Sequence, residues 1–196
     1  MKKFNKVVDF VSGTPQFRIT ESFDEQSPIY TFYSQTDLSE DLIGIITEDI
    51  DKKRVRTKDD VNTLCTGDVL FSLISGSAAV IGAAHQGYLY TQNFVKLIPE
   101  EKIDPQFLVY LLNENSVIKK QLLIGLQGSQ VLKYSLKQIK DLEIPILPHL
   151  EKQKIIGEIY FKQLRVQALK NRVAKQEMMI RLQQLEEVTK HDRESI

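Results

Sequence analysis

The sequence predicts an α+β protein, in which a compact globule of short, mostly antiparallel strands and helices precedes one long C-terminal helix. Two observations predict this class. In roughly the first hundred residues, short apolar segments alternate with glycine-containing turns, which is typical of antiparallel strands. After Pro148 the chain continues for about forty residues without a proline and with one glycine, Gly157, while apolar residues recur at helical spacing. We therefore expect the globule at residues 1–147 and the long helix at 148–196.

Strand signals fill the N-terminal part of the globule. Val7–Val11 is a short apolar segment that ends at a Ser-Gly-Thr-Pro turn, and Ile29–Tyr33 alternates β-branched and aromatic residues. Val69–Ile74 is almost continuously apolar, which favours a strand that is buried on both faces. Together with the further expected strands, these segments predict a compact antiparallel unit. The further expected strands are 42–46, 78–81, 88–91 and 94–98.

After Pro99 the pattern changes to that of helices. Asp104 is an expected N-cap followed by a proline at the first helical position, and one helix is expected from there to Gly125. Ser135 is expected to cap a short helix through Leu142. Segment 144–148 contains two prolines and is expected to be extended, because a residue before proline avoids the helical region.

The long helix carries apolar residues at the 4-3-4-3 spacing of a heptad seam, which Lys162 and Gln176 interrupt. A helix of this length would span roughly 60 Å, which is longer than a small domain is wide. The edge of its own globule cannot bury such a helix, so we expect an antiparallel coiled coil with another chain. The alternative is a terminal helix folded back on the globule. A second stripe, including Met178, Leu182 and Leu185, becomes apolar where the apolar residues of the first stripe end. The expected dimerisation residues are Ile155, Ile159, Val166, Leu169, Val173 and Ile180.

Composition and charge restrict the class of protein. The chain has 196 residues, 42% of them apolar, and a formal net charge of zero, so a nucleic-acid partner can only be inferred from local patches. The single cysteine, Cys65, has no partner and fits a reducing cytoplasm. No apolar run is long enough for a signal peptide or a membrane span, so we expect a cytoplasmic protein without membrane contact.

Signatures of enzymes and metal sites are missing from the sequence. There is no Gly-x-Ser-x-Gly elbow and no phosphate-binding loop. His85, His149 and His191 lack the paired spacing of zinc ligands. Glu100–Lys102, with Asp68 as a conceivable partner, resembles a fragment of a metal-dependent nuclease, but it lies in a loop where charged residues are usually solvated. We expect no catalytic activity, no metal and no cofactor.

Several motifs, in this order, resemble the specificity (S) subunit of type I restriction-modification enzymes. The turn Gly13–Pro15 is similar to that family's opening motif, and Gly67–Ser72 to its entry into a strand. Residues 144–156 are similar to the proline and Glu-Gln signature that opens the family's conserved helix, although Lys152 replaces the glutamate and His149 the second proline. Further similar segments are Ile81–Gly82, Gln92–Phe94, Ile103–Leu108 and Gly128–Leu132.

The resemblance implies a non-catalytic half-subunit with one target-recognition domain and one conserved helix, where a full S subunit has two of each. Two halves would pair through their helices and read a bipartite site on double-stranded DNA. Family members dock modification (M) subunits, which bind S-adenosylmethionine and methylate adenine, and through them restriction (R) subunits. None of these cofactors is expected to bind this chain. Two alternatives remain open: a decoy that competes for the M subunit, and a coiled-coil adaptor that binds no DNA.

The candidate DNA-contacting residues lie in one basic segment and two polar turns. Basic side chains neutralise phosphates and release counterions, whereas hydroxyl and amide groups hydrogen-bond base edges. A solvated loop, balanced by the acidic residues nearby, is the alternative for the basic segment, and ordinary turn chemistry is the alternative for the turns. The candidates are Lys52, Lys53, Arg54, Arg56 and Lys58 in the segment, Ser75 and Ser77 at one turn, and Gln127, Ser129, Gln130 and Lys133 at the other.

Overall fold

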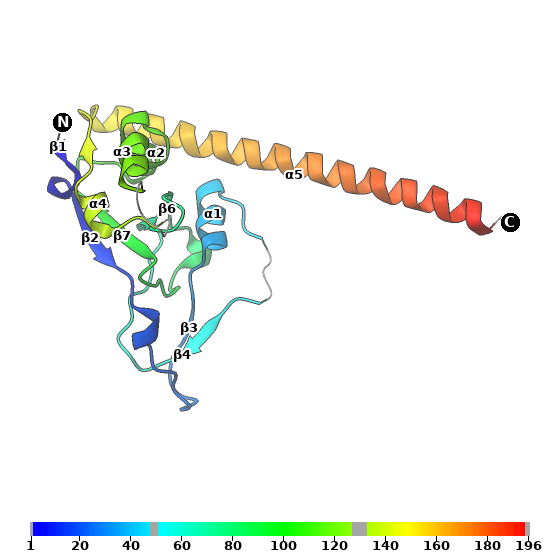
Figure 1. The fold of residues 1–196 in the computed structure, drawn as a ribbon, viewed down its shortest axis with the longest axis horizontal. Coiled ribbons are helices and arrows are strands. Elements are labelled where there is room, and N and C mark those ends of the chain that lie inside the picture. The colour runs from blue at the N-terminus through cyan, green and yellow to red at the C-terminus, as the bar shows by residue number, and fades with distance from the viewer. Residues whose placement is uncertain (1, 48–50, 127–132, 195–196) are drawn as a thin grey trace.

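A computed structural model describes residues 2–47, 51–126 and 133–194 of the chain, and it confirms the α+β class (Figure 1). The globule is built on a small antiparallel sheet with helices around it. Helix α5 (Leu150–Glu194) crosses one end of the globule and then extends far beyond it, as Figure 1 shows. Within the described residues, no helix is long and apolar enough to cross a membrane.

The central sheet has four antiparallel strands in the spatial order β2, β7, β5, β6. Val69 of β5 pairs with Leu97 on one side and with Val80 on the other. All four residues of β5 are buried, as the sequence predicts. Two small ribbons, β1 with β8 and β3 with β4, lie outside this sheet. The strands are β1 (Lys2–Lys3), β2 (Val8–Ser12), β3 (Ile29–Thr31), β4 (Arg54–Arg56), β5 (Val69–Ser72), β6 (Ala78–Val80), β7 (Phe94–Pro99) and β8 (Glu143–Ile144).

Two of the expected strands are wrong. Residues 42–46 are not a strand, because helix α1 (Gln35–Ile43) runs into them. Ser34 and Asp37 form a capping box at its start, and Gly44, in the left-handed conformation, ends it. Residues 88–91 form isolated bridges, such as those of Leu89 with Phe32 and Thr63, rather than a strand of the sheet.

Two helices replace the single helix expected after Pro99. Asn115 is extended between them, and its Oδ1 accepts hydrogen bonds from the backbone N–H groups of Val117 and Ile118 at 3.1 and 3.3 Å. Its side chain therefore starts a second helix where the first one ends. Asp104 and Ser135 cap their helices as predicted. These helices are α2 (Pro105–Glu114), α3 (Ser116–Leu126) and α4 (Leu136–Lys140); short 3-10 helices occupy Phe4–Lys6 (η1), Gln16–Arg18 (η2) and Ala83–His85 (η3).

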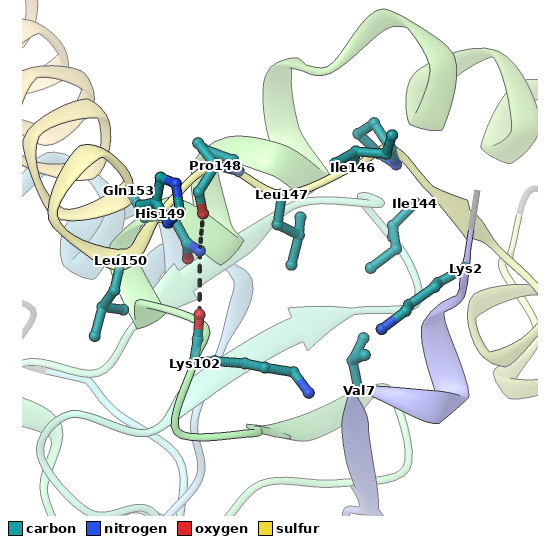
Figure 2. Close-up of a pocket in the computed structure, with 11 residues that line it drawn as sticks. Lys2, Val7, Lys102, Ile144, Ile146, Leu147, Pro148, His149, Leu150 and Gln153 are labelled. Carbon is teal, nitrogen blue, oxygen red and sulfur yellow. Dashed lines mark hydrogen bonds between the residues drawn. The ribbon is translucent and has the colours of Figure 1, made fainter.

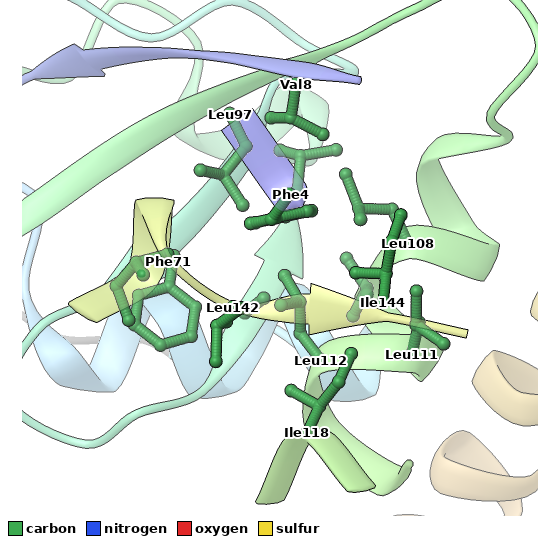
Figure 3. Packing of buried hydrophobic residues seen from close by; sticks show 14 of the residues in the cluster. Phe4, Val8, Phe71, Leu97, Leu108, Leu111, Leu112, Ile118, Leu142 and Ile144 are labelled. Carbon is green, nitrogen blue, oxygen red and sulfur yellow. The ribbon is translucent and has the colours of Figure 1, made fainter. Parts of the chain in front are cut away.

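Each face of the sheet covers its own hydrophobic cluster. Phe71 of β5 points into the larger cluster, where Phe4, Leu108 and Leu112 are also completely buried (Figure 3). Leu70, the neighbouring residue, points into the smaller cluster with Tyr33, Leu38 and Tyr90. Burying each large apolar side chain contributes about 1.5–3 kcal/mol, so this alternation along β5 is a main source of stability.

The first turns of α5 pack on the globule and the rest of the helix does not. Gly157 is buried against α2, where an added Cβ would lie 2.7 Å from the Cβ of Gln106 and from the backbone nitrogen of Phe107. Further along, the ring of Tyr160 lies 5.5 Å from that of Tyr110. From Arg165 to Thr189, every side chain except that of Ala168 is exposed.

Candidate nucleic-acid interface and helix seam

The apolar seam of α5 faces solvent along its whole length. Its six residues are between 43% and 61% exposed. Ile155 and Ile159, which lie in the turns that pack on the globule, belong to this exposed side, because the packed side of the helix carries Ile156 and Tyr160 instead. The second stripe is exposed as well, at 59% for Met178 and 63% for Leu185. The structure therefore leaves both stripes free to contact another helix.

The start of α5 is held by one buried glutamine. Gln153 is 1% exposed, and its Nε2 donates hydrogen bonds to the carbonyl oxygens of Lys102 at 3.1 Å and Pro148 at 2.8 Å (Figure 2). Its Oε1 accepts the backbone N–H of Asp104 at 3.0 Å. The glutamine of the helix-opening signature thus has a structural task at this position, and Lys152, which departs from the signature, is exposed.

A hollow of about 410 Å³ lies beside this helix start (Figure 2). The extended connector 144–149 forms most of its wall, with Val7 and the side chains of Lys2 and Lys102 at its edge. Ile146 on the connector is 93% exposed. The hollow follows from the two prolines, which keep the connector extended instead of letting it pack as a helix.

The basic segment contains β4, which pairs with β3 in a ribbon that lies away from α5 in Figure 1. Lys53 and Arg54 are exposed, and the ammonium of Lys53 lies 5.1 Å from the centre of the Phe32 ring. Arg56 is half-buried, and Lys58 forms an exposed ion pair with Asp24 at 2.5 Å. These four side chains share one ribbon and its continuation, an arrangement suited to following a phosphate backbone.

Lys52 has a different environment from the rest of the basic segment. Its side chain is only 16% exposed, and its Nζ lies 2.6 Å from Asp37 Oδ1 and 3.5 Å from His85 Nε2. The ammonium also lies 5.1 Å from the centre of the Tyr88 ring. Lys52 is therefore engaged inside the globule, and it does not present its charge to solvent as Lys53 and Arg54 do.

Lys52 closes a buried ionic cluster, which we define as Asp37, Glu40 and Asp41 of α1, His85 of η3, and Lys52. His85 Nδ1 lies 2.9 Å from Asp41 Oδ1, while its Nε2 lies 3.2 Å from Asp37 Oδ1 and 3.4 Å from Glu40 Oε2. Burial would lower the pKa of His85, but hydrogen bonds with Asp37 and Asp41 raise it to about 9. Burial would raise the pKa of Asp37, but hydrogen bonds from His85 and Lys52 hold it well below its usual range.

The sequence does not reveal the ionic cluster, because its members are far apart in the chain. The histidines lack ligand spacing among themselves, and His85 instead meets carboxylates of α1, whose last residues suit a strand by sequence. The signal that was present is the spacing of Asp37, Glu40 and Asp41, which places all three on one side of a helix. Gly82 of the Ile-Gly motif also serves this cluster, since its N–H donates to Asp41 Oδ1 at 3.0 Å and an added Cβ would lie 2.9 Å from that oxygen.

The polar-turn candidates lie near the end of β5. Ser75 and Ser77 belong to the turn between β5 and β6, and they line a hollow with Asn113 and Tyr160 on the side of α2 and α5. Lys133 donates a hydrogen bond to Asn93 Oδ1 at 2.8 Å, and Asn93 lies just before β7. These residues therefore form a group separate from the β3–β4 ribbon. Gln127, Ser129 and Gln130 lie outside the described residues.

Comparisons with known proteins agree with this architecture. The sequence matches the family model of the type I restriction modification DNA specificity domain over residues 10–177. The fold is similar to that of the HsdS subunit from Thermoanaerobacter tengcongensis, with 20% sequence identity and a TM-score of 0.56, over 88% of this chain and 39% of that chain. It is also similar to a chain from a structure that describes complex assembly and conformational transition of the type I R-M system, with 21% identity and a TM-score of 0.59, over 93% of this chain and 42% of that chain. A search among curated proteins finds no match.

The fold and the family match define a DNA specificity domain with a helical appendage. The chain belongs to the type I restriction modification DNA specificity domain family. It spans about two fifths of the length of the two structures that it resembles.

Proposed function

We propose that this chain acts as one half of a specificity subunit in a type I restriction-modification system. The globule reads one part of a bipartite DNA site, and α5 pairs antiparallel with the same helix of a second copy. The pair then recruits modification subunits, which carry out methylation, while this chain contributes no catalytic group. The membership in the specificity-domain family supports the reading role, and the exposed apolar seam of α5 supports pairing with a second copy.

One observation carries the pairing. Six seam residues on α5 are apolar and exposed, with Lys162 and Gln176 at the two positions between them, and the seam runs beyond the globule on a helix whose start is fixed by Gln153 and Gly157. A single helix of 45 residues would be about 67 Å long, and its side chains from Leu169 to Thr189 are all exposed. Pairing two such helices buries the seam and holds the two globules at a set separation.

The β3–β4 ribbon supports the DNA contact. Lys53, Arg54, Arg56 and Lys58 lie close together in the chain at the end of the globule remote from α5 (Figure 1). We propose that they contact phosphates, and that Ser75, Ser77 and Lys133 contribute polar contacts from the second group. Lys52 is left out of this proposal because its ammonium is held by Asp37.

The pairing is tested by the mass of the purified chain in light scattering. We expect a dimer, and we expect Leu169→Lys combined with Val173→Glu to give a monomer with unchanged circular dichroism of the globule. Gln167→Lys combined with Asn171→Glu, two exposed positions off the seam in the same turns, is the matched control and should remain dimeric. A wild-type chain that is monomeric throughout the micromolar range contradicts the pairing.

Recruitment is tested separately, by adding a modification subunit. We expect a stable complex that methylates a bipartite DNA duplex, with binding that weakens as salt increases. We also expect polar replacements of Met178, Leu182 and Leu185 to weaken the complex before they weaken the dimer, because this second stripe falls on the side of α5 away from the seam. A complex that forms but does not methylate would instead indicate a decoy.

A further inference from the structure

The buried ionic cluster contains the side chains of a metal site, although nothing in the proposed DNA function requires one. Asp37, Glu40 and Asp41 project from one side of α1 and His85 comes from η3, and all four side chains are at most 4% exposed. Three carboxylates in so small a buried volume repel one another unless cations compensate them. Among the described residues, Lys52 is the lysine that enters this cluster, and it supplies one positive charge.

The distances between three donor atoms match those of a first coordination shell. His85 Nε2 lies 3.2 Å from Asp37 Oδ1 and 3.4 Å from Glu40 Oε2, and the three donor atoms lie within 4.8 Å of one another. Ligands placed about 2.1 Å from a tetrahedral ion are roughly 3.4 Å apart. Two of the three distances between the ligand atoms are already close to this value. A small rotation of the carboxylates would therefore bring all three atoms into coordinating positions.

Asp41 orients the imidazole for this role. Asp41 Oδ1 accepts the Nδ1–H of His85 at 2.9 Å, so Nε2 is the nitrogen directed at Asp37 and Glu40. The other oxygen of Asp41 accepts the hydroxyl of Tyr33 at 2.8 Å. A carboxylate that holds the far nitrogen of a ligating histidine is the usual support around a protein metal site.

Glu40 provides an independent observation that points to a ligand. Its Oε1 accepts hydrogen bonds from the backbone N–H and the hydroxyl of Thr47. Its Oε2 is buried and has no hydrogen-bond partner among the described residues, although it faces His85 Nε2. Leaving such an oxygen unsatisfied destabilises the folded state, and coordination to a cation would remove this penalty.

We propose that Asp37, Glu40 and His85 bind one divalent cation of the Zn²⁺ or Mn²⁺ type, and that the Lys52 ammonium takes its place when the ion is absent. One imidazole nitrogen with two carboxylate oxygens suits these ions, whereas Mg²⁺ prefers oxygen ligands alone. Lys52 is the most exposed member of the cluster, so its departure opens the route by which an ion enters. Coordination needs the neutral imidazole of His85. The ion therefore displaces the Lys52 ammonium and also the proton on His85 Nε2.

The test is calorimetric titration of the chelator-treated full chain with ZnCl₂, MnCl₂ and MgCl₂. A Cys65→Ser background removes the exposed thiol as a competing ligand. We expect one Zn²⁺ or Mn²⁺ per chain, at least tenfold weaker binding of Mg²⁺, and a rise in Tm with the bound ion. Lys52→Met should tighten binding tenfold or more by removing the competing ammonium, and His85→Gln should weaken it at least a hundredfold.

The control is Glu158→Gln, which removes an exposed carboxylate paired with Lys162 on α5 and should leave binding unchanged. If His85→Gln and Glu158→Gln bind the ion equally well, the proposal is overturned. It is also overturned if neither the wild type nor Lys52→Met binds Zn²⁺ or Mn²⁺ at millimolar concentration. If the buried variants fail to fold, Mn²⁺ added to the folded wild type decides: broadening of the His85 ring signals supports the site, and broadening confined to other residues refutes it. No DNA is involved, so this result is independent of the proposed reading function.

Discussion

Gln153 joins the first turn of α5 to the first turn of α2, because its Oε1 accepts the backbone N–H of Asp104 at 3.0 Å. Asp104 is itself the N-cap of α2, where its Oδ1 accepts the N–H of Phe107 at 2.9 Å. The buried side-chain amide of Gln153 therefore connects α5 to α2, the helix that packs on the larger core cluster. This connection helps to fix the direction in which α5 leaves the globule.

Replacing this glutamine should destabilise the globule. Gln153→Ala leaves the N–H of Asp104 and the carbonyl oxygens of Lys102 and Pro148 without their partner in a buried place. We expect a loss of about 2–4 kcal/mol in the free energy of unfolding, measured with urea. Gln167→Ala, which removes only an exposed hydrogen bond to Asn171, should change it by less than about 0.5 kcal/mol. Equal effects of the two variants would contradict this role.

Gly157→Ala should lower Tm although it improves helix propensity. Alanine in an open helix position is more favourable than glycine by about 1 kcal/mol. Here the added Cβ would lie 2.7 Å from the backbone nitrogen of Phe107, so α5 must move away from α2. Asn171→Ala on the exposed part of α5 is the control and should raise Tm slightly. A rise in Tm for both variants would show that α5 and α2 can accommodate a methyl group at position 157.

Arg54→Ala and Arg56→Ala should each reduce the salt dependence of DNA binding. Each phosphate contact that is lost lowers the slope of log Kd against log salt by about one unit, whatever the DNA sequence. The measurement is fluorescence anisotropy with the assembled complex and a duplex at several salt concentrations. Lys152→Ala, at the exposed start of α5, is the control and should keep the slope. Unchanged slopes for both arginine variants would place the DNA elsewhere.

The stability of the globule should fall as pH rises through the pKa of His85. Burial would lower this pKa, but hydrogen bonds with Asp37 and Asp41 raise it from 6.5 to about 9. A raised pKa stabilises the folded state fully below pH 6.5, and this contribution is lost as pH passes 9. We expect the free energy of unfolding, measured with a chelator present, to fall by up to about 3 kcal/mol between these limits.

His85→Gln should remove most of this pH dependence, and His149→Gln, which changes an exposed histidine, should keep it. A wild-type profile that is flat from pH 6.5 to 9.5 would show that the imidazole is not held by the two carboxylates.

The elements that could be predicted have local signals. The buried β5, the caps at Asp104 and Ser135, and the long helix all follow from residues within a few positions of one another. Helix α1 has no clear signal in the sequence, because it is mostly polar and its capping box precedes apolar residues that also suit a strand. The break at Asn115 was missed because the apolar spacing continues across it, and the cap is visible only in the side-chain geometry.

The candidate site was predictable in part for the same reason. The seam on α5 follows from periodicity within one helix, and all six of its residues are exposed. The environment of Lys52 depends on Asp37 and His85, which are 15 and 33 residues away, so no local pattern reveals that its charge is used internally. The DNA contact of the basic segment therefore stays a prediction, and the side chains of this segment differ in their exposure.

The exposed stripe on α5 also has a consequence for how long a solitary chain survives. Turns that lack tertiary contacts open at small free-energy cost, and proteases and chaperones act on opened, apolar segments. A helical partner would shield these turns, so the cellular amount of the protein should rise and fall with the supply of its partners. Association would then govern the turnover of this chain as well as its geometry.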